Sequence, residues 1–144
     1  MNLAPLGLLI LLAACQTTPV IDAPPAGTAM IEVANGGSMF GSSSTRIYAD
    51  GTTVQDSATA GGKPLQTVQK GAPDAYSAAA AVIMAEGKRT KAAMKPHPDI
   101  CMDYGSDTVR ADPPIAGFDQ VSSSCPDDAV TALMDHVLAS IAAK

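Results

Sequence analysis

The chain has no tryptophan and few aromatic residues: only two phenylalanines and three tyrosines occur among its 144 residues. Its core must therefore be built mainly from Val, Ile, Leu, Met and Ala. It also lacks any block of Lys or Arg, since nine basic residues stand against fourteen acidic ones and the formal net charge is −5. This balance argues against nucleic acid and against a polybasic membrane surface as partners.

Motifs that carry catalytic chemistry are missing as well. No serine stands in a Gly-x-Ser-x-Gly turn, and no two carboxylates are singled out by their spacing. A metal site would have to use His97 and Cys101, with Asp103 and Cys125 as further ligands, whereas zinc sites usually show two close ligand pairs. His136 lies off the apolar stripe of its segment and is expected on the surface. We therefore expect no catalytic residues, no metal and no cofactor.

The start of the chain has the pattern of an exported protein. Residues 6–14 (LGLLILLAA) are too short to span a bilayer, which takes about 20 residues, but match the apolar part of a signal peptide. They end in Leu12-Ala13-Ala14-Cys15, which resembles the lipobox of bacterial lipoproteins. The segment departs from the usual pattern in having no Lys or Arg before the apolar run.

The resemblance implies a lipid on the Cys15 thiol and cleavage between Ala14 and Cys15. Two or three acyl chains would then anchor the protein stably to a membrane. Gln16 follows the cysteine where enterobacterial proteins retained in the inner membrane carry Asp, so the resemblance implies an outer-membrane location facing the periplasm. Residues 1–14 are thus predicted as signal peptide, and residues 15–27 as the lipidated cysteine and its tether.

The tether contains three prolines, which favour an extended, semi-rigid chain. At roughly 3.3 Å per residue, residues 16–27 would reach at most about 40 Å. Residues 28–144 are long enough for a single domain.

The remaining pattern predicts an α+β domain, with a small antiparallel sheet of about four to six strands packed by two helices. Strands are expected at residues 28–34, 65–70, 99–104, 107–111 and 118–123, and a hairpin turns at Asp50-Gly51. Residues 35–44 and 56–64 read as loops, and Asp112-Pro113-Pro114 reads as a strand end. One helix is expected from about residue 73 to 94. A final helix carries an apolar stripe of Val130, Leu133, Met134, Val137, Leu138 and Ile141.

Cys101 and Cys125 remain once Cys15 is lipidated. An even pair in an oxidising compartment predicts a disulfide. Closing a loop of about 25 residues would stabilise the fold by about 3.5 kcal/mol in a chain-entropy model.

The Gly-rich segment after the first strand is the predicted contact loop, formed by Gly36, Gly37, Met39, Phe40 and Gly41, with its two large apolar residues exposed. We expect a non-catalytic binding or assembly module of the envelope, which contacts the membrane through Cys15 and has an envelope protein as its candidate partner. The order of strand, Gly-Gly-x-x-x-Gly loop, Asp-Gly hairpin and terminal helix resembles emfourin-type inhibitor domains, which implies a periplasmic protease inhibitor as an alternative. A second alternative is an envelope hydrolase whose residues converge only in the fold.

Overall fold

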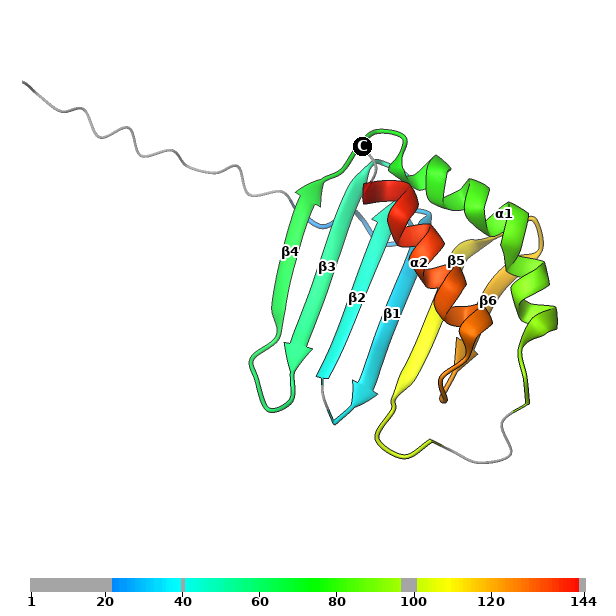
Figure 1. The fold of residues 1–144 in the computed structure, drawn as a ribbon. Helices are drawn as coiled ribbons and strands as arrows, with labels where there is room; N and C mark the ends of the chain where they lie inside the picture. Colours follow the sequence, from blue (N-terminus) through cyan, green and yellow to red (C-terminus); the bar gives the residue numbers. More distant parts are fainter. Residues whose placement is uncertain (1–21, 40, 97–100, 143–144) are drawn as a thin grey trace, which may run out of the picture.

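A computed structural model describes residues 22–39, 41–96 and 101–142 (Figure 1). These residues form six strands and two helices. The strands are β1 (Met30–Ser38), β2 (Gly41–Tyr48), β3 (Thr52–Thr59), β4 (Leu65–Lys70), β5 (Ser106–Ile115) and β6 (Phe118–Ser123); the helices are α1 (Ala75–Ala93) and α2 (Asp128–Ala142). The predicted α+β fold, with an antiparallel sheet packed by two helices, is confirmed.

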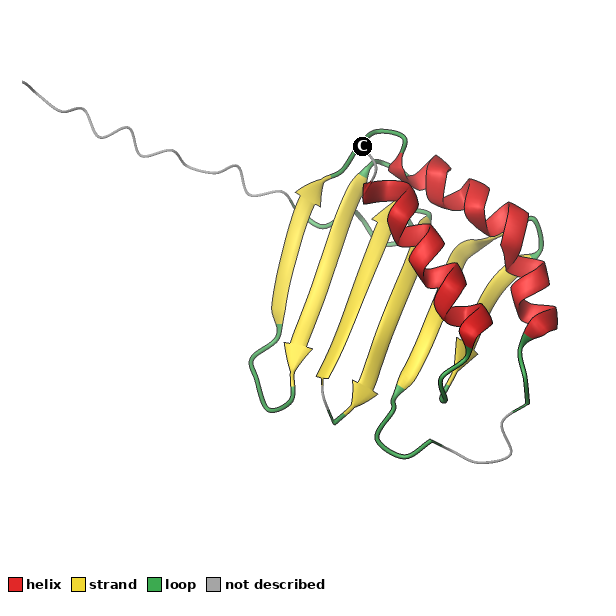
Figure 2. Cartoon of the chain, in the orientation of Figure 1, coloured by secondary structure: helices red, strands yellow, loops and turns green. Residues whose placement is uncertain are grey.

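The strands lie in the order β4-β3-β2-β1-β5-β6, and every neighbouring pair is antiparallel. Both helices lie on one face of this sheet (Figure 2). They pack against each other and against β1, β2, β5 and β6, whereas neither packs on β3 or β4. We call the opposite face of the sheet the open face, and the β3–β4 hairpin the bare half.

The core lies between the sheet and the helices, where alternate strand residues meet the apolar stripe of each helix. In α2, the predicted stripe is confirmed: Val130, Leu133 and Val137 are fully buried, and the other three members are partly buried against the core. Phe118 is a buried aromatic ring in this core and packs on Gly87 of α1, where a Cβ atom would lie only 2.6 Å from the ring. Gly87 is therefore required by close packing.

Residues 35–44, predicted as a loop, instead extend β1 and β2 into one long hairpin. Ser38 pairs with Gly41 across a tight turn, after a shift of register between Asn35 and Ser38. Gly37 and Gly41 have positive φ angles of 84° and 116°, and a Cβ at Gly41 would meet the Ala58 carbonyl oxygen at 2.1 Å. The glycines thus serve a strand end and a close approach. The loop predicted at residues 56–64 is also too long, because β3 continues to Thr59.

The strand predicted at residues 99–104 is wrong for its described part. Residues 101–105 form turns, with φ of 67° at Asp103 and 84° at Gly105, which a strand does not allow. The predicted break at Asp112 is also wrong, since β5 runs to Ile115. Pro113 and Pro114 follow Asp112, which is the last residue of β5 that pairs with β1. On the other side of β5, they fall within the register shift between β5 and β6. Their missing N–H groups therefore remove no ladder hydrogen bond there.

Candidate functional site

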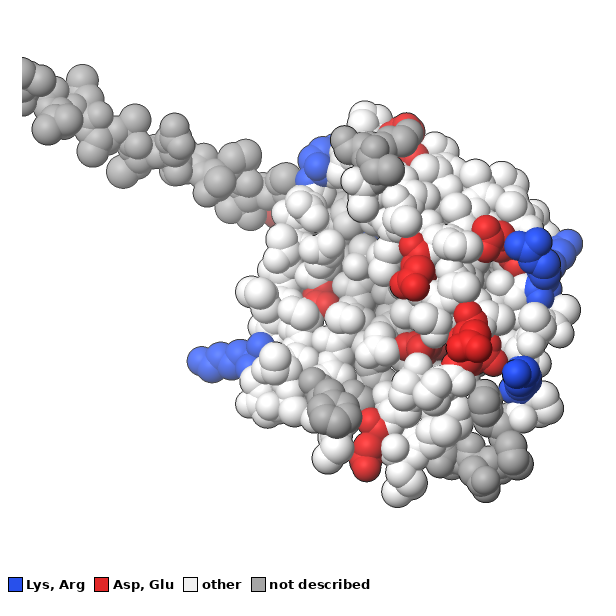
Figure 3. All heavy atoms as spheres, viewed as in Figure 1, with Lys and Arg blue, Asp and Glu red and all other residues white. Residues whose placement is uncertain are grey.

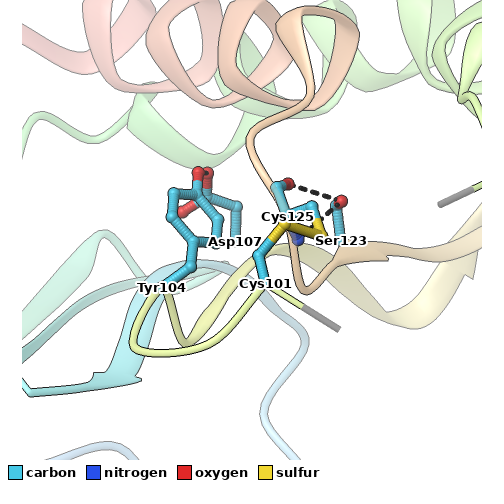
Figure 4. Close-up of a disulfide and its surroundings, with 5 residues drawn as sticks. All are labelled: Cys101, Tyr104, Asp107, Ser123 and Cys125. Atoms are coloured by element: carbon cyan, nitrogen blue, oxygen red, sulfur yellow. Dashed lines mark hydrogen bonds between the residues drawn. A yellow bond between two sulfur atoms is a disulfide. The ribbon is translucent and has the colours of Figure 1, made fainter. Parts of the chain in front are cut away.

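The predicted disulfide joins Cys101 to Cys125, whose Cα atoms are 5.1 Å apart. It ties the loop after α1 to the segment between β6 and α2 (Figure 4). Ser123 fixes that segment, because its Oγ donates to the Cys125 carbonyl at 2.7 Å and accepts from the Cys125 N–H at 3.3 Å. Cys15 and Phe40, two further predicted site residues, lie outside the described residues, as does His97.

A buried carboxylate lies beside the disulfide. Asp107 of β5 accepts hydrogen bonds from Asn35 Nδ2 and from the Tyr104 hydroxyl, each at 2.5 Å, one on each carboxylate oxygen. The Tyr104 and Asp107 side chains point toward one another (Figure 4). The hydrogen bond, together with burial and the negative charge, raises the pKa of Tyr104 to about 12. Because both carboxylate oxygens of Asp107 accept hydrogen bonds within the fold, this cluster links β1, β5 and the 101–105 loop.

The 101–105 loop lies beside the β1–β2 turn at one end of the sheet. A Cβ atom at Gly37 would lie 3.9 Å from Gly105 Cα, so the two segments are direct neighbours. Met39 on the turn and Met102 on the loop are exposed to 59% and 82%. We call the described residues of 36–41 and 101–105 the tip.

The tip partly matches the predicted contact loop. Met39 is exposed as expected, whereas Gly36, Gly37 and Gly41 serve the hairpin itself. Sequence reasoning missed Met102 because the alternation around it was interpreted as a strand. A sequence signal was nevertheless present in Asp103 and Gly105, residue types that favour turns.

A concave feature lies on the open face, at the other end of the sheet. A pocket of about 260 Å³ lies between residues 24–28 and the side chains of Glu32, Arg46, Tyr48 and Arg110. Thr28 holds this short segment in a turn, because its N–H and its hydroxyl both donate to the Pro25 carbonyl, at 3.2 and 2.8 Å.

The charges of this pocket form a row across the strands. Glu32 stands opposite Arg46 on one side and Arg110 on the other, and its carboxylate lies 3.2 Å from Arg110 Nη2. Arg46 also pairs with Asp56, which accepts from Gln66 at 2.7 Å. Burial alone would raise the pKa of Asp56, but these hydrogen bonds and the Arg46 charge lower it. Because the charges alternate and are paired, the row favours no ligand of one sign.

The helix side carries a groove of about 390 Å³ between α2 and the bare half, lined by Leu138 and Ile141 and floored by Thr53, Gln55 and Gln69. On the described atoms of this side, acidic groups are scattered and basic groups lie toward the margin (Figure 3). His136, expected as a solvated residue, is exposed but also bridges the helices through a 2.9 Å contact with Glu86.

Over residues 22–39, 41–96 and 101–142, no three His, Cys, Asp or Glu side chains gather as a metal site would require. None of the helices in these ranges is long and apolar enough to cross a membrane. Searches with the chain matched no family model, no curated protein and no solved structure.

Proposed function

We propose that the chain is the precursor of a bacterial envelope lipoprotein, anchored through Cys15, and that its domain is a non-catalytic binding module that uses the tip. The observation that carries this proposal is the place of Met39 and Met102, the two exposed methionines of the tip. The chain enters the sheet through Met30 at the start of β1, and the tip lies at the opposite end of that strand (Figure 1).

The tip has the chemistry of a protein contact surface. Methionine is flexible and polarisable, so it is common on surfaces that adapt to a protein partner. Asn35 of β1 and Tyr104 of the loop that carries Met102 both donate to Asp107. The disulfide also ties this loop to the segment before α2, so the backbone around the two methionines is held in place. An envelope protein with an apolar surface is the partner that this arrangement supports.

The anchor is tested by replacing its cysteine. Cys15→Ala should abolish incorporation of radiolabelled fatty acid and should leave an uncleaved precursor, because the lipid acceptor is gone. Gln16→Ala, beside the cysteine, is the control and should keep both lipid and cleavage. Persistent labelling of the Cys15→Ala protein would refute the anchor and leave the binding module untouched.

The binding module is tested by photocrosslinking from single positions in living cells. A photoreactive amino acid at Met39 or Met102 should capture one and the same envelope protein. Met84 on α1 is the matched control, because its exposure of 59% equals that of Met39. Equal capture from Met84, or different proteins from positions 39 and 102, would contradict a specific contact at the tip.

A further inference from the structure

The outer edge of β4 is a free strand edge. β4 is the end strand of the sheet and pairs, among the residues that the structure describes, with β3 alone. Every second residue of such a strand directs its backbone N–H and C=O outward, where they meet water or another strand. The edge therefore presents a regular row of donors and acceptors that matches an extended chain.

β4 lacks two features that often prevent strands from pairing edge to edge, namely a bulge and a charge in the middle of the strand. Its register with β3 is unbroken from Leu65 to Lys70, so no bulge twists it away. Pro64 stands before the strand, and the one charged residue within it, Lys70, is the last. Although β4 has only six residues, its edge is regular and carries one charge, so it is open to a further strand.

The opposite edge of the sheet, formed by β6, is irregular and lies beside a helix. The register of β5 with β6 shifts between Arg110 and Ile115, and α1 packs along β6. Lys91 of α1 also reaches Asp119 of β6, with 2.9 Å between Nζ and the carboxylate. A helix and a charged pair therefore flank β6, while among the described residues no helix packs along β4.

Steric access to β4 is also open, because neither helix packs on β3 or β4. With about 4.8 Å between neighbouring strands, a strand added beyond β4 would lie one strand further from β1 and β2, on which the helices pack. Two copies joined at β4 would keep their helices well apart.

We propose that β4 pairs antiparallel with β4 of a second copy of this chain, giving one continuous sheet. A two-fold axis normal to the sheet reverses the strand direction and keeps both helix layers on the same side. Residues directly opposite each other must then point to the same face of the sheet. The axis therefore places one residue of β4 opposite the same residue of the second copy, and not opposite its neighbour in the sequence. The middle of β4 offers two such centres, Thr67 opposite Thr67 or Val68 opposite Val68.

The sequence of β4 is compatible with its own copy in both registers. Centred on Thr67, the register places Lys70 opposite Pro64; centred on Val68, it places Lys70 opposite Gln66. Neither register brings like charges together, which would destabilise the pair. Residues 24–28 line the open-face pocket, so both chains would leave from the same side of the joined sheet. The pairing does not rest on the proposed anchor but is compatible with two anchors in one membrane.

Disulfide cross-linking tests the contact directly. In the full chain, isolated from cells in its native state, Thr67→Cys or Val68→Cys adds a cysteine beside the existing three, of which Cys101 and Cys125 are bonded. One of the two variants should form a covalent dimer on mild oxidation, because directly opposed Cβ atoms lie about 5 Å apart. Gln120→Cys, exposed on the other edge strand, is the matched control and should stay monomeric.

Association is then measured by sedimentation of the same full chain over a range of concentrations. Thr67→Lys or Val68→Lys should weaken self-association by about fivefold or more, through like charges at the axis, with an unchanged circular dichroism spectrum. Three outcomes would overturn the proposal: a monomer at every concentration, equal cross-linking from residue 120, or a cross-linked product that contains another protein.

Discussion

The two halves of the sheet differ in how far their apolar side chains are buried. Under the helices, strand residues such as Ile31, Val33 and Val109 are completely or almost completely buried in one cluster. In the bare half, Leu65 is 65% exposed, and the buried Val54 stands outside that cluster. The covered half therefore supplies most of the apolar burial that stabilises the domain. In the bare half, full burial is confined to Thr52, Thr53 and Val54 at the start of β3, and the remainder depends on strand pairing.

A matched pair of leucine substitutions should give the largest contrast. Leu133→Ala should lower the free energy of unfolding by about 4 kcal/mol, because it leaves a cavity at a fully buried site. Leu65→Ala should change it by less than about 0.5 kcal/mol, because the side chain is mainly in water. Urea unfolding of dilute protein, followed by circular dichroism, measures both. A large loss from Leu65→Ala would mean that the bare half is covered in solution.

Breaking the disulfide should have the next largest effect. Reduction of Cys101–Cys125, which closes a span of 24 residues, should lower the stability by about 3.5 kcal/mol. Hydrogen exchange should become faster in β5 and α2 before it changes in β3 and β4, because the bond lies in the covered half. The protein with Cys101 and Cys125 both replaced by Ala is the control, and the reductant should not change its stability. Equal exchange changes in both halves would show that they do not open separately.

The smallest effect concerns Tyr104. Tyr104→Phe should cost about 1 to 2 kcal/mol at neutral pH, because one hydrogen bond to a carboxylate is lost. The raised pKa means that this bond contributes fully below about pH 10 and is lost as the pH rises toward 12. Tyrosine absorbance should show a step near pH 12 that disappears in Tyr104→Phe and remains in Tyr76→Phe. A step that survives in Tyr104→Phe would refute the assignment.

Local chemistry made part of this fold predictable. The Asp50-Gly51 turn is a two-residue signal, and Gly51 takes the expected positive φ of 83°. The spacing of Val130, Leu133 and Val137 identified the buried face of α2. The disulfide was predicted from the number of cysteines and the expected oxidising compartment, and this prediction needs no knowledge of the geometry.

The remainder depends on residues far apart in the chain. Gly36 and Ser43 belong to strands although their segment has the composition of a loop, because β5 and β3 pair with it on either side. The hydrogen bond between Asn35 and Asp107 spans 72 residues, and no local pattern marks either partner. The tip could therefore be predicted only in its β1–β2 half, through Met39.

The turn held by Thr28 changes the geometry of the proposed tether. Its hydrogen bonds to Pro25 close residues 25–28 into a turn, and the bond from the Ala49 N–H to the Ala29 carbonyl attaches the end of this turn to the domain. Only residues 16–24 would then remain to span the gap between Cys15 and the fold. At roughly 3.3 Å per residue they reach at most about 30 Å, in place of about 40 Å for the whole segment. An anchored domain would thus work within about one domain diameter of the bilayer, which restricts its partners to proteins that lie close to the membrane surface.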